Sequence, residues 1–237
     1  TTGRPKEAEV AWREALALQQ QLAAEFPSRL DYRQELARSH TNLGNLLRET
    51  GRPQEAETAY RDALKLQEQL ADEFPTRPDY RQELARSYTN LGILLYTTGR
   101  PKEAEVAWRE ALALQKQLAA EFPSRLDYRQ ELARSHTNLG NLLRDTGRPK
   151  EAEAAYRDAL KLQEQLADEF PTRPDLRQEL ARSYTNLGNL MATTGRPKEA
   201  EVAWREALAL QKQLAAEFLN MPDYQNETAG TLGNLAI

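Results

Sequence analysis

The sequence predicts an all-α protein, an α-solenoid of about ten helices paired as antiparallel hairpins. Three observations predict this fold. Apolar residues recur at steps of three and four, which is the spacing of one helical face. Residues 2–49 and 98–145 differ at only two positions. A Thr-Gly-Arg-Pro tetrad also recurs every 48 residues, with its glycines at Gly3, Gly51, Gly99, Gly147 and Gly195. Such a period is typical of units that bury their apolar faces on one another.

The period divides the chain into five units of a single repeat domain, residues 1–237. The units are residues 2–49, 50–97, 98–145, 146–193 and 194–237. Residue 1 falls inside a unit and residue 237 inside a predicted helix, so we expect a fragment of a larger protein. In the last unit Leu219 replaces the usual proline, and residues 223–230 depart from the pattern of residues 31–38. This divergence predicts a natural C-terminal boundary of the array.

The first predicted helix covers residues 4–26 and has no helix before it. Terminal repeats normally present a polar outer face. This helix instead carries an apolar face that no neighbour within the chain covers, formed by Ala8, Trp12, Ala15 and Leu22. The pattern predicts self-association through the uncapped ends of the array.

The next helix, residues 31–50, represents the first-type helix of each unit. Asp31, followed by Gln34 three residues later, predicts a capping box. Gly51 ends the helix because glycine readily adopts a left-handed conformation. The apolar stripe consists of Tyr32, Leu36, His40, Leu43 and Leu47.

The second-type helix follows at residues 53–74. Pro53 suits the first helical position because its φ is fixed and its missing N–H is not needed there, and the helix ends before Pro75. The link between the two helix types is so short that they must pack antiparallel. The alternation continues to a final first-type helix that begins at Asp223. The stripe of the second-type helix consists of Ala56, Tyr60, Ala63, Gln67, Leu70 and Phe74.

Composition excludes several classes of function. The net charge of −4 lacks the basic excess with which nucleic-acid-binding proteins neutralise phosphates. No apolar run approaches the roughly 20 residues needed to cross a bilayer, so we expect no membrane role. The chain contains no cysteine, which fits a reducing compartment. We therefore expect a cytoplasmic protein.

No motif predicts catalysis, a metal site or a cofactor. His40 and His136 lie on an apolar stripe without a neighbouring ligand, so we interpret them as packed side chains. Carboxylates such as Glu9 and Glu57 are interpreted as a solvated face near a helix start. Buried amides need partners, so we expect a hydrogen-bonded ladder among the glutamines in line with the second-type stripe. These are Gln19, Gln67, Gln115, Gln163 and Gln211.

The repeated pattern resembles the tetratricopeptide repeat family. The residues that carry the resemblance are Leu43-Gly44, Leu47, Gly51, Ala56, Tyr60 and Ala63, and the match continues through the later units. The resemblance implies a right-handed superhelix whose concave face is lined by the first-type helices. It also implies that Gly44 faces Ala56 or Ala63. In this family the asparagine before Leu-Gly often holds a peptide backbone or carboxylate.

The polar side of the first-type helix is the candidate binding surface. Arg38, Asn42 and Asn45 lie three or four residues apart and share one face. Arginine offers a two-pronged contact to a carboxylate, and asparagine offers both a donor and an acceptor to an extended main chain. The predicted peptide-binding residues are Arg38, Asn42, Asn45, Arg86, Asn90, Ile93, Tyr96, Arg134, Asn138, Asn141, Arg182, Asn186 and Asn189.

Ile93 and Tyr96 stand where the first unit has Asn45 and Arg48. This change predicts an apolar anchor for one aliphatic or aromatic side chain of the partner. Drift after duplication explains the same change without a function.

The sequence thus predicts a noncatalytic protein-interaction scaffold that binds an extended peptide or protein segment, acidic segments among them. Two alternatives stay open. Arg38 can simply pair with Glu35 while Asn42 links neighbouring units. The array can instead be a structural spacer or a self-assembling rod in a larger protein.

Overall fold

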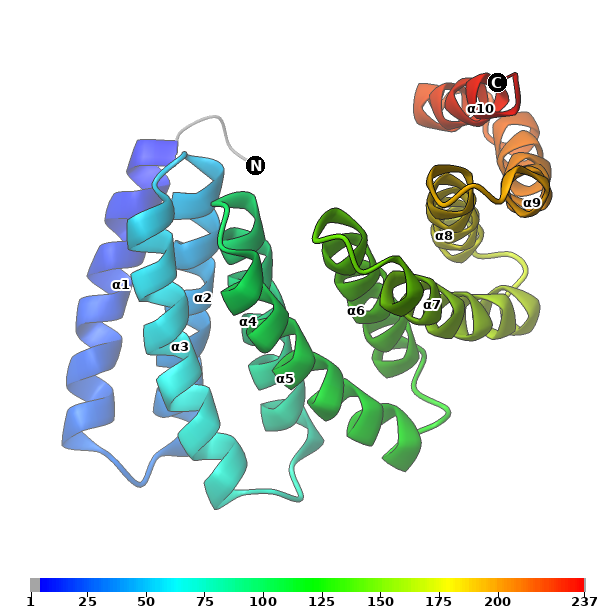
Figure 1. The fold of residues 1–237 in the computed structure, drawn as a ribbon. Helices are drawn as coiled ribbons and strands as arrows, with labels where there is room; N and C mark the ends of the chain where they lie inside the picture. Colours follow the sequence, from blue (N-terminus) through cyan, green and yellow to red (C-terminus); the bar gives the residue numbers. More distant parts are fainter. Residues whose placement is uncertain (1–4, 237) are drawn as a thin grey trace. The chain divides into compact units, whose positions relative to one another are not determined.

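The computed structural model describes the backbone of residues 5–236 and the side chains of residues 7 and 9–236. Gly3 of the first tetrad and the side chain of Ala8 therefore lie outside the described residues. Within residues 5–236 the regular structure is helical, and no strand occurs (Figure 1). The helices are α1 (Pro5–Glu25), α2 (Leu30–Glu49), α3 (Pro53–Glu73), α4 (Pro78–Thr97), α5 (Pro101–Glu121), α6 (Leu126–Asp145), α7 (Pro149–Glu169), α8 (Pro174–Thr193), α9 (Pro197–Glu217) and α10 (Pro222–Leu235). The all-α prediction is confirmed.

The helices form two compact halves, each of which contains several repeats: Thr1–Glu121 with α1–α5, and Phe122–Ile237 with α6–α10. Within each half every helix packs against the next one along the chain as an antiparallel neighbour (Figure 1). The first-type helices also touch one another, α2 against α4 and α6 against α8. The organisation into a single repeat domain stays a prediction.

The helix ends fall within one residue of those predicted from the sequence, but one predicted capping motif does not form. The second-type helix α3 begins at Pro53 as predicted. The capping box at Asp31 and Gln34 is wrong, because α2 begins one residue earlier and its start has no side-chain cap. Arg29 instead donates two hydrogen bonds to the Asp31 carboxylate, at 2.9 and 2.6 Å. Asp31 thus lies in the first helical turn, where a carboxylate stabilises the helix dipole.

Each residue of the repeated tetrad has a local role. The Thr50 hydroxyl donates to the carbonyl of Leu46 at 2.8 Å, which satisfies one of the free carbonyls at the end of α2. Gly51 has a φ of +74°, the left-handed conformation expected from the sequence. Arg52 forms ion pairs, and Pro53 opens the next helix.

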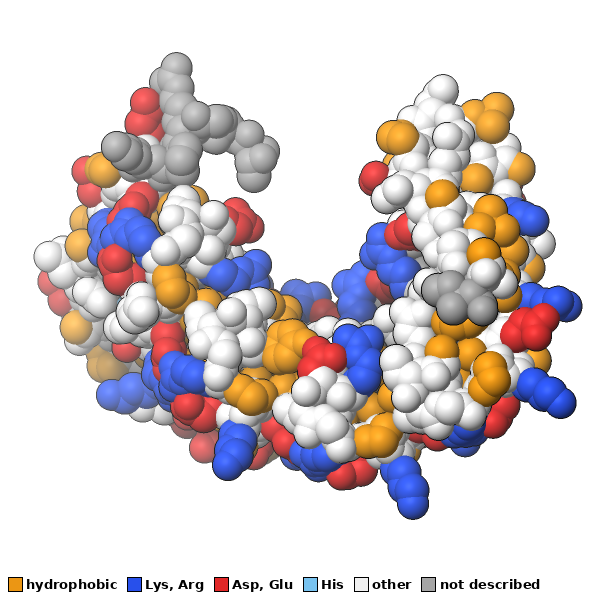
Figure 2. All heavy atoms as spheres, turned by 45° about the horizontal axis from the view of Figure 1, so that its top comes forward, with side chains coloured by type: hydrophobic (Ala, Val, Ile, Leu, Met, Phe, Trp, Pro, Cys, Tyr) orange, Lys and Arg blue, Asp and Glu red, His pale blue; other side chains and the backbone are white. Residues whose placement is uncertain are grey.

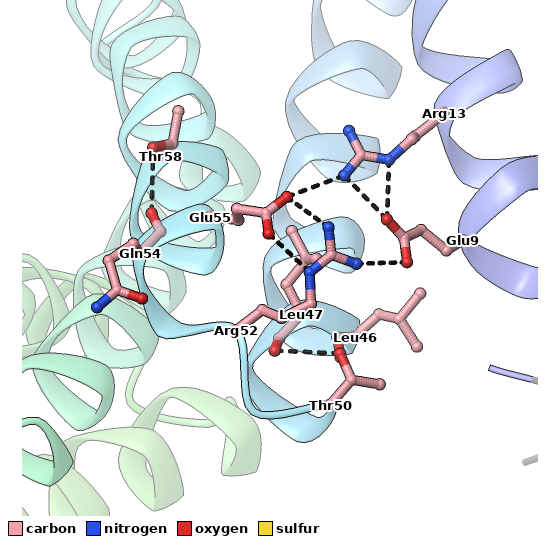
Figure 3. Close-up of polar contacts among 9 residues, drawn as sticks. All are labelled: Glu9, Arg13, Leu46, Leu47, Thr50, Arg52, Gln54, Glu55 and Thr58. Carbon is pink, nitrogen blue, oxygen red and sulfur yellow. Dashed lines mark hydrogen bonds and ion pairs between the residues drawn. The ribbon is translucent and has the colours of Figure 1, made fainter. Parts of the chain in front are cut away.

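Arg52, in the turn between α2 and α3, connects α1 with α3 (Figure 3). Its guanidinium donates to Glu9 of α1 at 2.6 Å and to Glu55 of α3 at 2.7 Å. Arg13 of α1 also reaches both carboxylates, at 2.9 and 3.2 Å. The hydrogen bonds from Arg52 hold the pKa of Glu9 below its usual value. Glu9 thus lies in an ion-paired cluster at the surface, where exposed pairs of this kind contribute little stability.

A glycine packs against an aromatic ring inside each hairpin. A Cβ atom built on Gly44 would lie 2.6 Å from the ring of Tyr60, and one on Gly140 would lie 2.6 Å from the ring of Tyr156. The expectation that Gly44 faces Ala56 or Ala63 is thus wrong. The aromatic ring occupies the space that a Cβ atom would need at this point, so only glycine leaves room for it.

Four of the five glutamines of the second-type stripe are buried and Gln19 is partly buried, but the ladder does not form. Gln67 and Gln211 are each 3% exposed. Their Oε1 atoms have no hydrogen-bond partner in the described part of the chain, and neither amide atom of Gln67 has one. Arg38, which lies near Gln67, donates to Glu35 instead. The ladder prediction is therefore wrong, because nearby charged groups pair with each other.

Candidate functional site

The asparagines that precede Leu-Gly lie on the first-type helices α2, α4, α6 and α8. Asn42 is exposed and the other three are partly buried. None of their side chains forms a hydrogen bond with another described residue. Each amide therefore retains a free donor and a free acceptor. The four residues are Asn42, Asn90, Asn138 and Asn186.

Hydroxyl pairs join neighbouring first-type helices beside these amides. Thr41 of α2 and Ser87 of α4 lie 3.2 Å apart, and Thr137 of α6 and Ser183 of α8 lie 3.4 Å apart. Since Asn42 directly follows Thr41 on α2, its amide projects from a surface whose helices are already held together. The link between units that the sequence assigned to Asn42 is made by these hydroxyls.

The predicted arginines share carboxylate partners. Arg38 lies 3.2 Å from Glu35 and 3.9 Å from Glu83 of the next first-type helix. Arg134 donates to Glu179 at 2.6 Å, and Arg182 donates to Glu227 at 2.8 Å. Arg86 lies 3.7 Å from Glu83. Because every arginine of the predicted set has a nearby carboxylate, the surface around the asparagines is not strongly positive.

A second set of asparagines supports the packed aromatic rings. The Oδ1 atoms of Asn45 and Asn141 accept hydrogen bonds from the Tyr60 and Tyr156 hydroxyls, each at 2.7 Å. Asn189 accepts one from the indole N–H of Trp204 at 3.0 Å. These three asparagines hold the ring against the glycine, a role that the sequence analysis missed. Their binding of a peptide stays a prediction.

Ile93 and Tyr96 are partly buried on α4. The Tyr96 ring packs against Trp108 of α5, with 5.6 Å between the ring centroids. Ile93 has no hydrogen-bond acceptor, unlike Asn189 at the equivalent position. The Trp108 indole N–H therefore donates to the carbonyl of Thr89 at 3.2 Å. The Tyr96 ring thus covers the tryptophan, and the apolar anchor for a partner stays a prediction.

His40 is a packed side chain 8% exposed, with its Nδ1 atom 3.9 Å from the Asp62 carboxylate. Burial lowers the pKa of His40 below its ordinary value of 6.5, and Asp62 opposes this shift. Between the lowered pKa and 6.5 the unfolded chain binds the proton and the folded chain does not. Stability contributed by neutral His40 is therefore lost as the pH falls below 6.5.

Replacing His40 with tyrosine, the residue at the equivalent position 88, is expected to reduce the loss of Tm between about pH 7.5 and pH 5.5. Paired carboxylates such as Glu73 stay ionised in this range, because Arg33 holds the pKa of Glu73 below 4.5. Thermal unfolding followed by circular dichroism at several pH values measures the effect. Identical pH slopes for the two proteins would contradict it.

The surface carries charges of both signs. Figure 2 shows lysine and arginine side chains beside aspartate and glutamate side chains on the face that it presents. In the part of the chain that the structure describes, no three acidic or histidine side chains gather as a metal site would require. Among those same residues no helix is long and apolar enough to cross a membrane.

A family model described as "Tetratricopeptide repeat" matches residues 36–75, 84–122, 132–171 and 180–215, more than half of the chain. No curated protein matches the sequence. Among solved structures, the crystal structure of BtubC (BKLC) from P. vanneervenii is similar with a TM-score of 0.64 and 23% identity, covering 100% of this chain and 88% of that one. A crystal structure of MamA has a TM-score of 0.57 and 17% identity, covering 91% and 98%. At these identities the likeness shows the fold alone.

Proposed function

Because the chain belongs to the tetratricopeptide repeat family, whose repeats generally serve in protein–protein interaction, we propose that it binds an extended segment of a partner protein on its first-type helices. In this proposal the protein is a noncatalytic scaffold. The free amides of Asn42, Asn90, Asn138 and Asn186, called the asparagine set below, are the principal contacts.

The observation that carries the proposal is the unpaired state of the asparagine set. The three partly buried members, Asn90, Asn138 and Asn186, lose part of their hydration and gain no hydrogen bond in return. An extended peptide presents N–H and C=O groups along its length, and one asparagine amide matches one of each. Each bound peptide unit would therefore satisfy both halves of an amide that the fold leaves free.

The proposed partner is not required to be acidic. The arginines beside the asparagine set lie near carboxylates such as Glu83 and Glu179. A negatively charged peptide would have to compete with these internal carboxylates for each guanidinium. We therefore expect affinity to depend only weakly on salt concentration, unlike binding that rests on charge attraction.

The test begins with peptides selected on the 237-residue chain from a random-peptide display library. Replacing all four residues of the asparagine set with alanine is expected to weaken selected peptides at least about tenfold, because each loses a paired amide contact. Tm is expected to stay unchanged, since no hydrogen bond within the described chain is removed. Calorimetric titration measures the affinity.

A matched control replaces exposed amides on the second-type helices with alanine, at Gln69, Gln117, Gln165 and Gln213. This control variant also loses four amides, but from the second-type helices. We expect it to bind peptide with wild-type affinity. If selected peptides bind the asparagine variant with wild-type affinity, or if no peptide is enriched, the proposal is wrong.

A self-associating rod is the second candidate, favoured by the exposed face of α1. Leu22 of α1 is 37% exposed, whereas the equivalent Leu70 and Leu118 are each 1% exposed. The chain is expected to form dimers at high concentration, and Leu22→Lys is expected to abolish them. The control is Val106→Lys, because Val106 is exposed within the array. A sedimentation coefficient independent of concentration would rule this candidate out.

The other end of the array does not favour head-to-tail stacking. Ala236 stands one 48-residue period after Gly188. A Cβ on Gly188 would lie 2.5 Å from the Trp204 ring, so the Cβ of Ala236 would obstruct an aromatic ring placed in the same way. Trp12 of a second copy could not pack on α10 as Trp204 packs on α8. We therefore expect dimers to pair α1 with α1.

A further inference from the structure

One arginine on the first-type helices has no carboxylate partner. Arg48, in the last turn of α2, is partly buried, and it is the one arginine of residues 9–236 with no carboxylate oxygen within 4.0 Å. The more exposed Arg134 and Arg182 are both paired. The guanidinium of Arg48 has thus lost part of its hydration without gaining an ion pair, and it retains its donors for an anion.

One residue accounts for the unpaired state of Arg48. The first and third units differ at only two positions, and one of them is Glu49 in place of Asp145. In the third unit the Nε atom of Arg144 donates to Oδ1 of the adjacent Asp145 at 2.8 Å. Glu49 is one methylene longer and forms no ion pair with Arg48. The same arginine is therefore neutralised by its neighbour in the third unit and left unpaired in the first.

A second donor lies one helical turn before Arg48. Asn45 is three residues earlier, on the same face of α2. Its Oδ1 atom accepts from the Tyr60 hydroxyl at 2.7 Å, which orients the amide and leaves its Nδ2 group without a partner. Burial raises the pKa of Tyr60, and the charge of Arg48 opposes this shift more than Glu49 adds to it. The surroundings of this hydroxyl are therefore net positive, as an anion site requires.

The next first-type helix supplies no carboxylate to Arg48. Residues 45 positions apart on α2 and α4 lie side by side, as Arg38 and Glu83 do at 3.9 Å. The same offset places Ile93 beside Arg48. Arg48 thus has an isoleucine as its neighbour where Arg38 has a glutamate, so a bound partner has to supply the negative charge.

We propose that Arg48 and Asn45 bind one carboxylate of the partner segment, an assignment that rests on the proposed function. The guanidinium donates to both carboxylate oxygens, and the Asn45 Nδ2 group donates to one of them. A carboxylate carries the single negative charge that neutralises one guanidinium, whereas a phosphate group would leave excess negative charge. One such contact in a segment otherwise held by the asparagine set keeps the salt dependence of binding weak.

The test uses small probes, so that it does not depend on a selected peptide. N-acetyl-glutamate N-methylamide presents an acidic side chain, and N-acetylalanine presents a terminal carboxylate. The neutral match is N-acetyl-glutamine N-methylamide, and N-acetyl-phosphoserine N-methylamide presents a phosphate. Each probe is titrated into the isotope-labelled chain to about 50 mM at constant ionic strength, since fragments of this size bind weakly and salt screens charge.

We expect the Arg48 Nε–H and Asn45 Nδ2 signals to shift saturably with a carboxylate probe. The glutamine and phosphoserine probes are expected to bind at least threefold more weakly. The tighter of the two carboxylate probes identifies the source of the carboxylate, an acidic side chain or a chain end.

Glu49→Asp gives the first unit the residue of the third. Its carboxylate is expected to pair with Arg48 and to weaken carboxylate binding at least threefold. Arg48→Gln is expected to abolish the shift of the Asn45 signal. The control is Lys65→Gln, which removes an exposed cation of α3 that has no ion pair with a described residue. It is expected to leave carboxylate binding unchanged.

The proposal is overturned if neither carboxylate probe gives saturable shifts at Arg48 and Asn45, or if the glutamine or phosphoserine probe binds best. It is also overturned if Glu49→Asp or Arg48→Gln leaves carboxylate binding unchanged. Loss of peptide binding in the asparagine variant is a separate result, because that variant leaves Arg48 and Asn45 intact. Carboxylate binding at Arg48 in a chain that enriches no peptide would contradict the proposed function alone.

Discussion

Replacing Tyr156 with alanine is expected to lower the free energy of unfolding by about 3–5 kcal/mol, the usual cost of removing a large aromatic side chain from a core. The Tyr156 side chain is fully buried, and its ring lies on the backbone of α6 at Gly140. Removing it leaves a cavity between α6 and α7 and takes away the donor to Asn141. Urea unfolding followed by circular dichroism measures the change.

Tyr156→Phe separates packing from hydrogen bonding. It keeps the ring and removes only the hydroxyl that donates to Asn141. The expected loss is about 0.5–1.5 kcal/mol, the usual net contribution of one hydrogen bond. If the alanine variant loses no more stability than the phenylalanine variant, the ring does not hold the hairpin together.

Gly140→Leu is expected to lower the free energy of unfolding by about 1–3 kcal/mol through overpacking. Its Cβ would lie 2.6 Å from two ring carbons of the buried Tyr156. Neither the ring nor the helix backbone can move aside without disturbing the hairpin. The same urea titration measures the loss, and an unchanged midpoint would contradict the close contact.

Two further variants test the cause. A Cβ on Gly233 of α10 would meet nothing within 4 Å, so Gly233→Ala is expected to raise stability by up to about 1 kcal/mol through helix propensity. Combining Gly140→Leu with Tyr156→Ala lets the leucine occupy space that the ring has left. The double variant is therefore expected to lose less stability than the sum of the two single changes.

The hairpin boundaries could be predicted because they depend on residues close in sequence. Pro53 can open a helix and Gly51 can turn left-handed whatever surrounds them. The capping box could not be predicted correctly, because the Asp31 carboxylate pairs with Arg29, two residues earlier, and the helix begins before it. The Asp31 carboxylate can accept hydrogen bonds either from backbone N–H groups as a cap or from Arg29. The sequence pattern does not show which of the two interactions is more stable.

The face of the candidate site could be predicted from helical spacing, but its free residues could not. Asn42 and Asn45 look equivalent in sequence. They differ because the Tyr60 hydroxyl, 15 residues beyond Asn45, reaches its Oδ1 atom across the hairpin. The pairing of arginines had a detectable signal, since a glutamate recurs 45 residues after each of them, as Glu83 does after Arg38.

The most direct test of the central claim is an NMR titration of the chain with a display-selected peptide, observing side-chain amide signals. We expect the Nδ2 signals of the asparagine set to shift to saturation, because these free amides pair with the peptide backbone. The exposed Gln69, Gln117, Gln165 and Gln213 signals are expected to stay in place. Saturable shifts confined to these glutamines, with the asparagine signals unmoved, would contradict the proposed binding surface.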